Sequence, residues 1–376
     1  MQGNTKIAVA IIISLAVAYY ALHSGDPILR VSNDAGSWNE SAVHPEDSML
    51  RAINDTGSGN KIAVYPGDLI QQAINASTSG DTIVVYPGTY AENMLVDKPL
   101  TIISQSGNPA DTVIQAADPE AHVFHITSDN AIIGGFNITG ASGRGNAGIY
   151  IYGSNGNITN NRLVYNDYGI FLKDSNNWVL NNNSVSKGKY GIYLSDSREN
   201  TLAGNKANNN SWYGVYLRDS ANNQLNFNTA NLNDKCGICL KNSSGNRVAG
   251  NSISNAGIKV DRSGIYLEDS CSNILTGNNI SKSWEGISLS NSSANELSKN
   301  VVSTNYFSIG LDGSDKNKIL DNIVDSNIYK NGITLANSQN NILEDNLAYS
   351  GLGVRVWSDP DSKNNTVDDG FWAMIL

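Results

Sequence analysis

Hydrophobic and polar positions recur together in one short unit between residues 148 and 365. Each unit reads Gly, aliphatic, any residue, aliphatic, any residue, Asp or Asn, Ser, followed by an Asn, an aliphatic residue and a second Asn. Successive units begin 21 to 27 residues apart, and Ser308 replaces the glycine once. A period of this length predicts an architecture of stacked supersecondary units.

The alternation inside each unit predicts its secondary structure. After Gly191, Ile192 and Leu194 show the two-residue period of a strand with one buried face. Further apolar positions follow at Leu202 and Ala207. Three short strands per unit, with Gly, Asn and Ser at the corners, predict an all-β fold, a single-stranded right-handed parallel β-helix. A leucine-rich repeat has a similar period but needs a longer leucine consensus and a helical return.

Polar residues recur at fixed places in the unit. One column contains Asn205 and Asn228, and another contains Ser197 and Ser220. Asn tolerates the left-handed backbone of a tight bend, and stacked amides can bond one another, so both columns are expected to be structural.

The N-terminal residues differ from the repeats. Residues 1–23 hold an apolar run, 7–22, after Lys6, which predicts a signal peptide or an N-terminal membrane anchor. Residues 24–60 form a polar linker, and 61–376 form the β-helix domain. Either N-terminal alternative places the domain outside the cytoplasm, at the cell surface or secreted, with membrane contact through 7–22 if that segment is not cleaved.

Both ends of the β-helix domain are predicted to be covered, because a solenoid exposes an apolar end. At the N-terminal end, 61–107 is the expected cap, and it includes a short N-terminal capping helix with Asp68 as N-cap. The expected buried helical face is Leu69, Ile70, Ala73 and Ile74. Residues 371–376 are expected to cover the last coil.

Two segments also carry a family resemblance. Residues 80–90, which read GDTIVVYPGTY, and 98–103, which read KPLTII, resemble the opening of the pectin-lyase-like superfamily. The repeats from Gly148 onward resemble its NosD-like branch. The resemblance implies a parallel β-helix on the cell envelope, and it implies little about chemistry, because the superfamily includes lyases, hydrolases, epimerases and proteins without known activity. It also implies a further possible role, that of an accessory factor for a copper enzyme.

Candidate catalytic residues are few. The chain has no His after His125, so the His-dependent machinery that the resemblance implies for hydrolases and epimerases is missing. A polysaccharide lyase acting on acidic glycans needs a basic side chain and often calcium but no histidine, so this activity is compatible with the residues of the chain. Its candidate residues, partly in the longest unit, are Arg218, Lys241, Asp261, Arg262 and Glu268.

Aromatic residues are expected to line the outer face of the first strand of each unit. Flat rings beside polar groups suit a sugar, so the sequence predicts a structural or carbohydrate-binding protein whose partner is an envelope or extracellular polysaccharide. The alternative is that stacked rings only stabilise neighbouring strands. The candidate binding residues are Tyr150, Phe171, Tyr193, Tyr216, Tyr266, Trp212 and Trp284.

Composition limits the remaining partners. The net charge is −10, which argues against nucleic acid. Cys236 and Cys239 have a C-x-x-C spacing, but with Cys271 they are expected to form a local disulfide or plain thiols rather than a metal site. In an extended segment, His122 and His125 would lie on opposite faces, so no metal site is predicted, and no cofactor other than the calcium of a lyase.

Overall fold

A computed structural model describes residues 59–256, 263–326, 331–349 and 355–368. The chain divides into two units, Met1–Ser48 and Met49–Leu376, and every described residue belongs to the second. The predicted segment 7–22, nearly all of the linker and the C-terminal residues 371–376 lie outside the described residues. No helix in the described ranges is both long and apolar enough to span a membrane.

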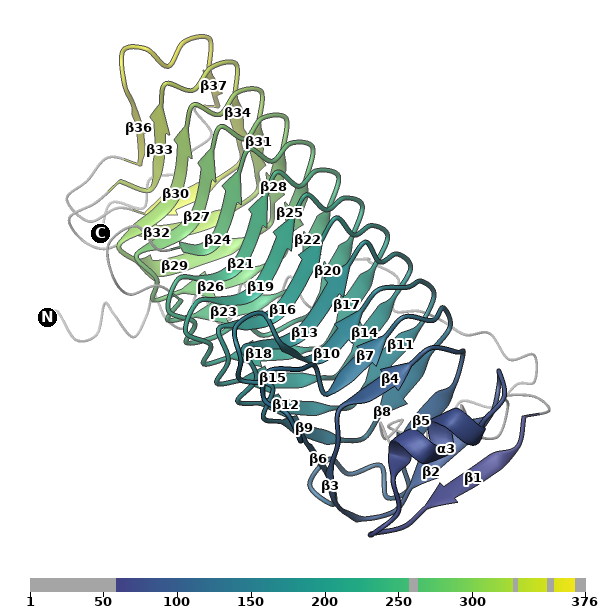
Figure 1. The fold of residues 1–376 in the computed structure, drawn as a ribbon. Coiled ribbons are helices and arrows are strands. Elements are labelled where there is room, and N and C mark those ends of the chain that lie inside the picture. The colour runs from purple at the N-terminus through teal and green to yellow at the C-terminus, as the bar shows by residue number, and fades with distance from the viewer. Residues whose placement is uncertain (1–58, 257–262, 327–330, 350–354, 369–376) are drawn as a thin grey trace, which may run out of the picture. The chain divides into compact units, whose positions relative to one another are not determined.

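The described part of the second unit is a right-handed parallel β-helix (Figure 1). A typical coil contributes one strand to each of three sheets, and neighbouring strands pair in parallel. We call the sheet with the longest strands the long-strand sheet. Its strands are β4 (Met94–Val96), β7 (Phe124–Ile126), β10 (Ala147–Ile151), β13 (Tyr168–Lys173), β16 (Tyr190–Ser195), β19 (Tyr213–Arg218), β21 (Cys236–Lys241), β24 (Ser263–Glu268), β27 (Glu285–Ser290), β30 (Phe307–Asp312), β33 (Ile333–Ala336) and β36 (Val356–Ser358).

The other two sheets complete each coil. The second sheet contains β1 (Lys61–Val64), β2 (Thr82–Val85), β5 (Thr101–Ser104), β8 (Ile132–Gly134), β11 (Asn157–Thr159), β14 (Val179–Asn181), β17 (Thr201–Ala203), β20 (Gln224–Asn226), β22 (Arg247–Ala249), β25 (Ile274–Thr276), β28 (Glu296–Ser298), β31 (Lys318–Leu320), β34 (Ile342–Glu344) and β37 (Thr366–Val367). The third sheet has two parts, linked by bridges through Thr229. They are β3 (Gly88–Ala91), β6 (Thr112–Gln115), β9 (Asn137–Thr139), β12 (Arg162–Val164), β15 (Ser184–Ser186) and β18 (Lys206–Asn208), then β23 (Ser252–Ser254), β26 (Asn279–Ser281), β29 (Val301–Asn305), β32 (Ile323–Ser326) and β35 (Leu347–Tyr349).

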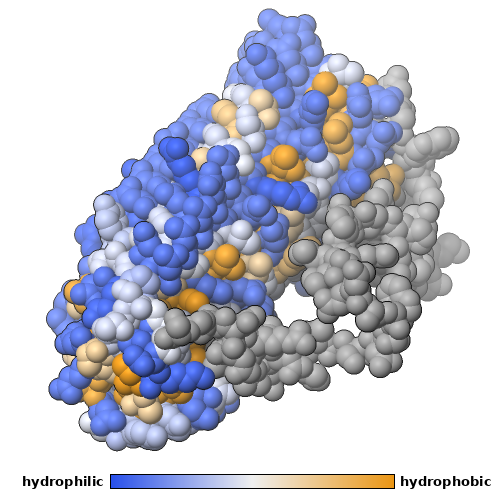
Figure 2. All heavy atoms as spheres, turned by 90° about the vertical axis from the view of Figure 1, so that its right-hand side faces the viewer, coloured by the Kyte–Doolittle hydropathy of each residue, from blue (hydrophilic) through white to orange (hydrophobic). Residues whose placement is uncertain are grey.

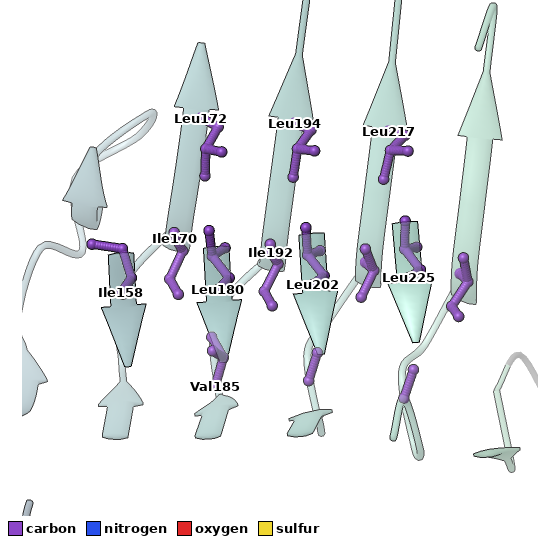
Figure 3. Packing of buried hydrophobic residues seen from close by; sticks show 14 of the residues in the cluster. Ile158, Ile170, Leu172, Leu180, Val185, Ile192, Leu194, Leu202, Leu217 and Leu225 are labelled. Atoms are coloured by element: carbon purple, nitrogen blue, oxygen red, sulfur yellow. The ribbon is translucent and has the colours of Figure 1, made fainter. Parts of the chain in front are cut away.

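Aliphatic columns fill the interior, as the alternation predicts. Leu172 pairs with Leu194, and Leu194 with Leu217, in successive coils, and all three side chains are fully buried (Figure 3). Each buried aliphatic side chain stabilises the fold by roughly 1.5–3 kcal/mol before the entropy of ordering is subtracted. The surface seen in Figure 2 is mostly hydrophilic, with hydrophobic residues in small groups, so the apolar side chains gather inside the coils.

Buried asparagines form a hydrogen-bonded ladder along one corner. The Nδ2 of Asn205 donates to the Oδ1 of Asn228 at 3.0 Å, and Asn228 repeats this bond to Asn251 at 3.0 Å. The ladder was predicted, but the backbone assignment was wrong. The left-handed residues are those just before the ladder, such as Gly204 (φ 64°) and Phe227 (φ 55°), because the ladder amides must face inward to bond.

The predicted helix is present as α3 (Ile70–Ala76), with Ile70, Ala73 and Ile74 buried. Two details of the prediction were wrong. Leu69 is the N-cap residue and is 47% exposed, and Asp68 instead accepts a hydrogen bond from the Tyr65 N–H. The helix start is held by the carboxylate of Glu92, whose oxygens accept the Ile70 and Gln71 N–H groups at 2.8 and 3.0 Å.

The coils extend beyond the recognisable repeats. Strands β1, β2 and β5 already stack in parallel as the first members of the second sheet, inside the segment expected to be only a cap. The segment between residues 108 and 147 adds β6 to β9, each paired in parallel with a strand of the coil before it. The β-helix therefore begins at about residue 61, and the repeat consensus marks only its most regular part.

Candidate functional site

Aromatic side chains concentrate on the outer face of the long-strand sheet, which we call the aromatic face. Residues two positions after the unit glycine point away from the core there and lie in register from coil to coil. The position just before the glycine adds a second row of rings. The aromatic face comprises Tyr150, Phe171, Tyr193, Tyr216 and Tyr266, together with Tyr168, Tyr190 and Tyr213.

The rings of the aromatic face stack on one another. The ring centroids of Tyr168 and Tyr190 are 4.6 Å apart, and those of Tyr193 and Tyr216 are 5.1 Å apart, with nearly parallel planes in both pairs. Stacking leaves Tyr193 only 8% exposed, whereas Tyr216 and Tyr266 stay partly exposed. Each pair contributes roughly 0.2–1 kcal/mol to sheet stability, and the ring surface that stays exposed can contact a ligand.

Burial strengthens the preference of these tyrosines for the neutral, protonated form. It raises the pKa of Tyr168 and of Tyr266 to about 12, and it raises the pKa of Tyr190, Tyr213 and Tyr216 as well. The hydroxyl groups therefore stay protonated at neutral pH. They are neutral groups that can both donate and accept a hydrogen bond, as sugar hydroxyls require.

Trp212 lies at the corner where the chain enters β19, and two lysines contact its ring. The Nζ of Lys189 is 3.8 Å from the ring centroid, and the Nζ of Lys235 is 3.7 Å from it. Tyr190 meets the same indole edge to face, with centroids 5.5 Å apart. The indole is half-buried, and it joins the lysines to the aromatic face. The sequence named Trp212 but missed both lysines, whose only signal was their place shortly before a unit glycine.

Two surface pockets flank this corner. The first, about 640 Å³, is lined by Trp212, Lys187 and Lys189, with Tyr165 and Asp167 among the other lining residues. The second, about 610 Å³, runs over the later coils of the long-strand sheet. Its lining includes Tyr213, Lys235, Tyr266, Glu285 and Asp312.

Trp284 lies apart from this arrangement. Its ring stacks on Tyr306, with centroids 4.0 Å apart, in a later coil. The described residues that line the two pockets do not include Trp284. Trp284 therefore remains a candidate on position alone.

The charged candidates for a lyase site lie beside the aromatic face. Arg218, Lys241 and Glu268 are in register in β19, β21 and β24, while Asp261 and Arg262 lie outside the described residues. Lys241 forms an ion pair with Glu268 at 2.8 Å, and Arg218 pairs with Asp219 at 3.1 Å. The hydrogen bond that Lys241 donates to Glu268 raises the pKa of Lys241, whereas a lysine base needs a lowered pKa. The lyase activity stays a prediction, and the ion pair between Lys241 and Glu268 disfavours Lys241 as its base.

The cysteines are free thiols in the structure. Cys236 and Cys239 continue the two aromatic rows, so Cys239 lies between Tyr216 and Tyr266 in register. Both are buried, and burial, followed by a side-chain hydrogen bond with Cys239, raises the pKa of Cys236 well above its usual value. A protonated thiol is a poor nucleophile and metal ligand, so the Cys236 thiol has no reactive character.

One prediction about the histidines was wrong. His122 and His125 lie on the same side, with ring centroids 5.5 Å apart, and His122 stacks on Tyr150 at 4.3 Å. His122 precedes β7 rather than belonging to it, so strict strand alternation does not apply. Burial, followed by the charge of His125, lowers the pKa of His122 to about 4. Its Nδ1 accepts the Ala147 N–H at 2.9 Å.

Comparisons with solved structures show the same fold at low sequence identity. The Dettilon tailspike protein (gp208) is 16% identical with a TM-score of 0.65, covering 79% of this chain and 68% of that one. The A-module of the Azotobacter vinelandii mannuronan C-5 epimerase AlgE4 is 15% identical with a TM-score of 0.64, covering 84% and 99%. The catalytic domain of a GH87 alpha-1,3-glucanase, in complex with nigerose, is 13% identical with a TM-score of 0.55, covering 83% and 68%.

A comparison with curated proteins found no match. The family model described as periplasmic copper-binding protein (NosD) matches residues 74–261 and 253–364. These segments span well over half of the chain. The protein therefore belongs to the NosD family, and its parallel β-helix fold is the fold of these solved structures.

Proposed function

We propose that the protein is a carbohydrate-binding β-helix protein of the cell envelope, and that the aromatic face with the Trp212 corner binds a polysaccharide. The observation that carries this proposal is the row of rings on successive coils, in which Tyr216 and Tyr266 stay partly exposed, beside two surface pockets that Trp212 and Tyr266 line. Sugar faces are apolar and their rims are polar, so they suit rings with protonated hydroxyls. Structures of this fold include a mannuronan epimerase and a glucanase, which supports a polysaccharide partner.

Two further parts of the proposal rest on the sequence and the family. Residues 7–22 would direct the chain out of the cytoplasm as a signal or an anchor, and the family is described as periplasmic. Helix α3, with Ile70 and Ile74 buried against the first coils, would close the apolar end of the stack.

Copper is part of the family description, and the described residues do not fit a copper site. In the described ranges, no group of three or more His, Cys, Asp or Glu side chains is placed to hold a metal ion. One nitrogen of His122 is already taken by the Ala147 N–H, and the Cys236 thiol is buried and protonated. The proposed function assigns no role to copper at these residues.

A binding screen tests the proposal. The full chain is titrated with a panel of envelope and plant polysaccharides, and the double variant Trp212→Ala/Tyr266→Ala is titrated in parallel. By analogy with bases stacked on aromatic side chains, removing one aromatic ring is expected to cost about 1–3 kcal/mol of binding free energy. The double variant is therefore expected to bind at least tenfold more weakly.

A matched control separates the face from general aromatic exposure. Phe227 is 74% exposed and lies at a different corner, between β20 of the second sheet and the third sheet. Phe227→Ala is expected to leave polysaccharide binding unchanged. If the wild type binds no polysaccharide of the panel, or if the double variant binds as the wild type does, the proposed function is wrong.

A further inference from the structure

Lysines gather at the Trp212 corner although the protein is acidic overall. Lys189 and Lys235 come from the coils on either side of Trp212, and both Nζ atoms lie within 3.8 Å of one ring centroid. The two nitrogens can therefore be no more than twice that distance apart. A third lysine, Lys187, lines the same pocket, and its Nζ donates to the Tyr165 hydroxyl at 2.7 Å.

The shared ring holds two like charges close together. Cation–π contact fixes both long side chains over Trp212, but the indole carries no net charge to offset their repulsion. Their separation is within the distance over which physiological salt leaves charges unscreened, roughly 8 Å. An anionic group beside both ammonium groups would be attracted by each and would remove this repulsion.

The surroundings show where an anion can enter. Lys189 lines the first pocket and Lys235 lines the second, so the pair stands where the two pockets approach each other. Asp167 and Asp234 also line the first pocket, and the Asp167 carboxylate accepts the Gly145 N–H at 2.7 Å. A chain of sugars that passes from one pocket to the other would cross the lysine pair.

We infer that the polysaccharide is acidic, and that Lys189 and Lys235 bind a carboxylate or another anionic substituent of a sugar residue next to Trp212. This inference rests on the proposed function and deepens it, because it names the chemical class of the ligand. Lysine is suited to this role as a mobile point charge with three donors, which can follow anionic groups along a polymer.

The test compares two polymers on the full chain. Polygalacturonate is the acidic probe and dextran of similar length is the neutral probe, and each is titrated by calorimetry at low and at high salt. Polygalacturonate is expected to bind more tightly than dextran and to lose affinity at high salt, because ion pairs in the open pocket are screened. A galacturonate monomer is titrated in parallel and is expected to bind far more weakly, since it cannot reach both pockets.

Charge-removing variants locate the effect. Lys189→Gln/Lys235→Gln is expected to weaken polygalacturonate binding by about tenfold or more. Lys206→Gln/Lys318→Gln removes the same charge from exposed positions on the outer faces of the third and second sheets and is expected to change affinity less than about twofold. Thermal unfolding of all variants checks that each remains folded.

The outcomes separate this inference from the proposed function. Equal affinity for dextran and polygalacturonate, or an equal loss of polygalacturonate affinity in both double variants, overturns the claim that the ligand is acidic. The aromatic face then remains the proposed binding site. If the monomer binds as tightly as the polymer, the claim that the ligand is a polymer is overturned, and the lysines form a simple anion site. Absence of polygalacturonate binding overturns the inference, and if the polysaccharide panel also fails to bind, the proposed function falls with it.

Discussion

Single buried polar residues hold the corners of this protein. Asn228 is fully buried, and its side chain accepts the Asn205 N–H at 2.9 Å and donates to the Leu202 carbonyl at 2.8 Å. A buried donor or acceptor that loses its partner costs about 1–3 kcal/mol. Replacing one asparagine of the ladder therefore destabilises the fold, because the groups that it bonded stay buried without a partner.

Asn228→Ala is expected to lower the free energy of unfolding by about 3–5 kcal/mol, because it strands two backbone groups and the Asn205 amide. Chemical denaturation of the wild type and the variant measures this difference. Asn226→Ala is the matched control, since Asn226 is partly exposed and its side chain makes one long contact to Gln224. Equal stability of the two variants would show that the ladder carries no special weight.

His122 makes stability depend on pH. Its folded pKa is about 4, below the value of about 6.5 for an unperturbed His, so between these values the unfolded chain binds more protons. The free energy of unfolding is therefore expected to fall as the pH drops from 6.5 toward 4. Since the ring is partly exposed, the expected loss is about 1–2 kcal/mol.

The variant His122→Gln isolates this effect, because Gln keeps an acceptor for the Ala147 N–H but does not titrate. Urea denaturation at pH 7 and pH 4.5 is expected to show a smaller pH-dependent loss in the variant than in the wild type. Asp325, whose pKa is raised by burial, acts in the opposite direction and is common to both proteins. An unchanged loss in His122→Gln would assign the acid sensitivity to other groups.

At the scale of the strand, the unit glycine is explained by the neighbouring coil. A Cβ on Gly214 would lie 2.6 Å from the Gly237 carbonyl oxygen and 2.9 Å from that of Ala207. The glycine is thus required for close packing of backbone against backbone. The repeat pattern shows this glycine, but no sequence spacing indicates which atoms it must avoid.

Gly214→Ala is expected to lower the free energy of unfolding by about 1–3 kcal/mol, because backbone atoms on two sides must shift. Gly310→Ala is the control within the same sheet, since a Cβ there would meet only Thr334 Oγ1 at 3.4 Å, and it is expected to be tolerated. Thermal unfolding compares the two. A Gly310 variant as unstable as the Gly214 variant would mean that strand flexibility, and not contact, sets the cost.

The sequence predicted the strands well because their signal is local. The positions of Leu172 and Leu194 fix which face is buried, and one period fixes the register of the next coil. Side-chain contacts between coils were harder to predict from the sequence. The Lys189 and Lys235 contacts with Trp212 and the approach of His122 to His125 depend on how corners bend, and alternation carries no information about corners. The β-helix domain was predicted to begin at residue 61, but the strand pairing of residues 61–147 was not predicted, because these residues do not repeat the consensus.

For the whole β-helix domain, the account makes one central claim: a polysaccharide lies along the aromatic face. The rings from Tyr150 to Tyr216 lie side by side in successive coils only because each coil repeats the last in register. The other outer faces of the described coils carry mainly polar residues, with isolated apolar side chains such as Phe227 and Val179. A long ligand should therefore protect one face of the molecule and leave the others open.

Hydroxyl-radical footprinting of the full chain, with and without a polysaccharide that binds, tests this claim most directly. We expect labelling of Trp212, Tyr216 and Tyr266 to fall when the polysaccharide is bound, while labelling of Phe227 and Tyr65, both exposed and away from this face, stays the same. Protection of Phe227 with undiminished labelling of Trp212 and Tyr216 would contradict the account.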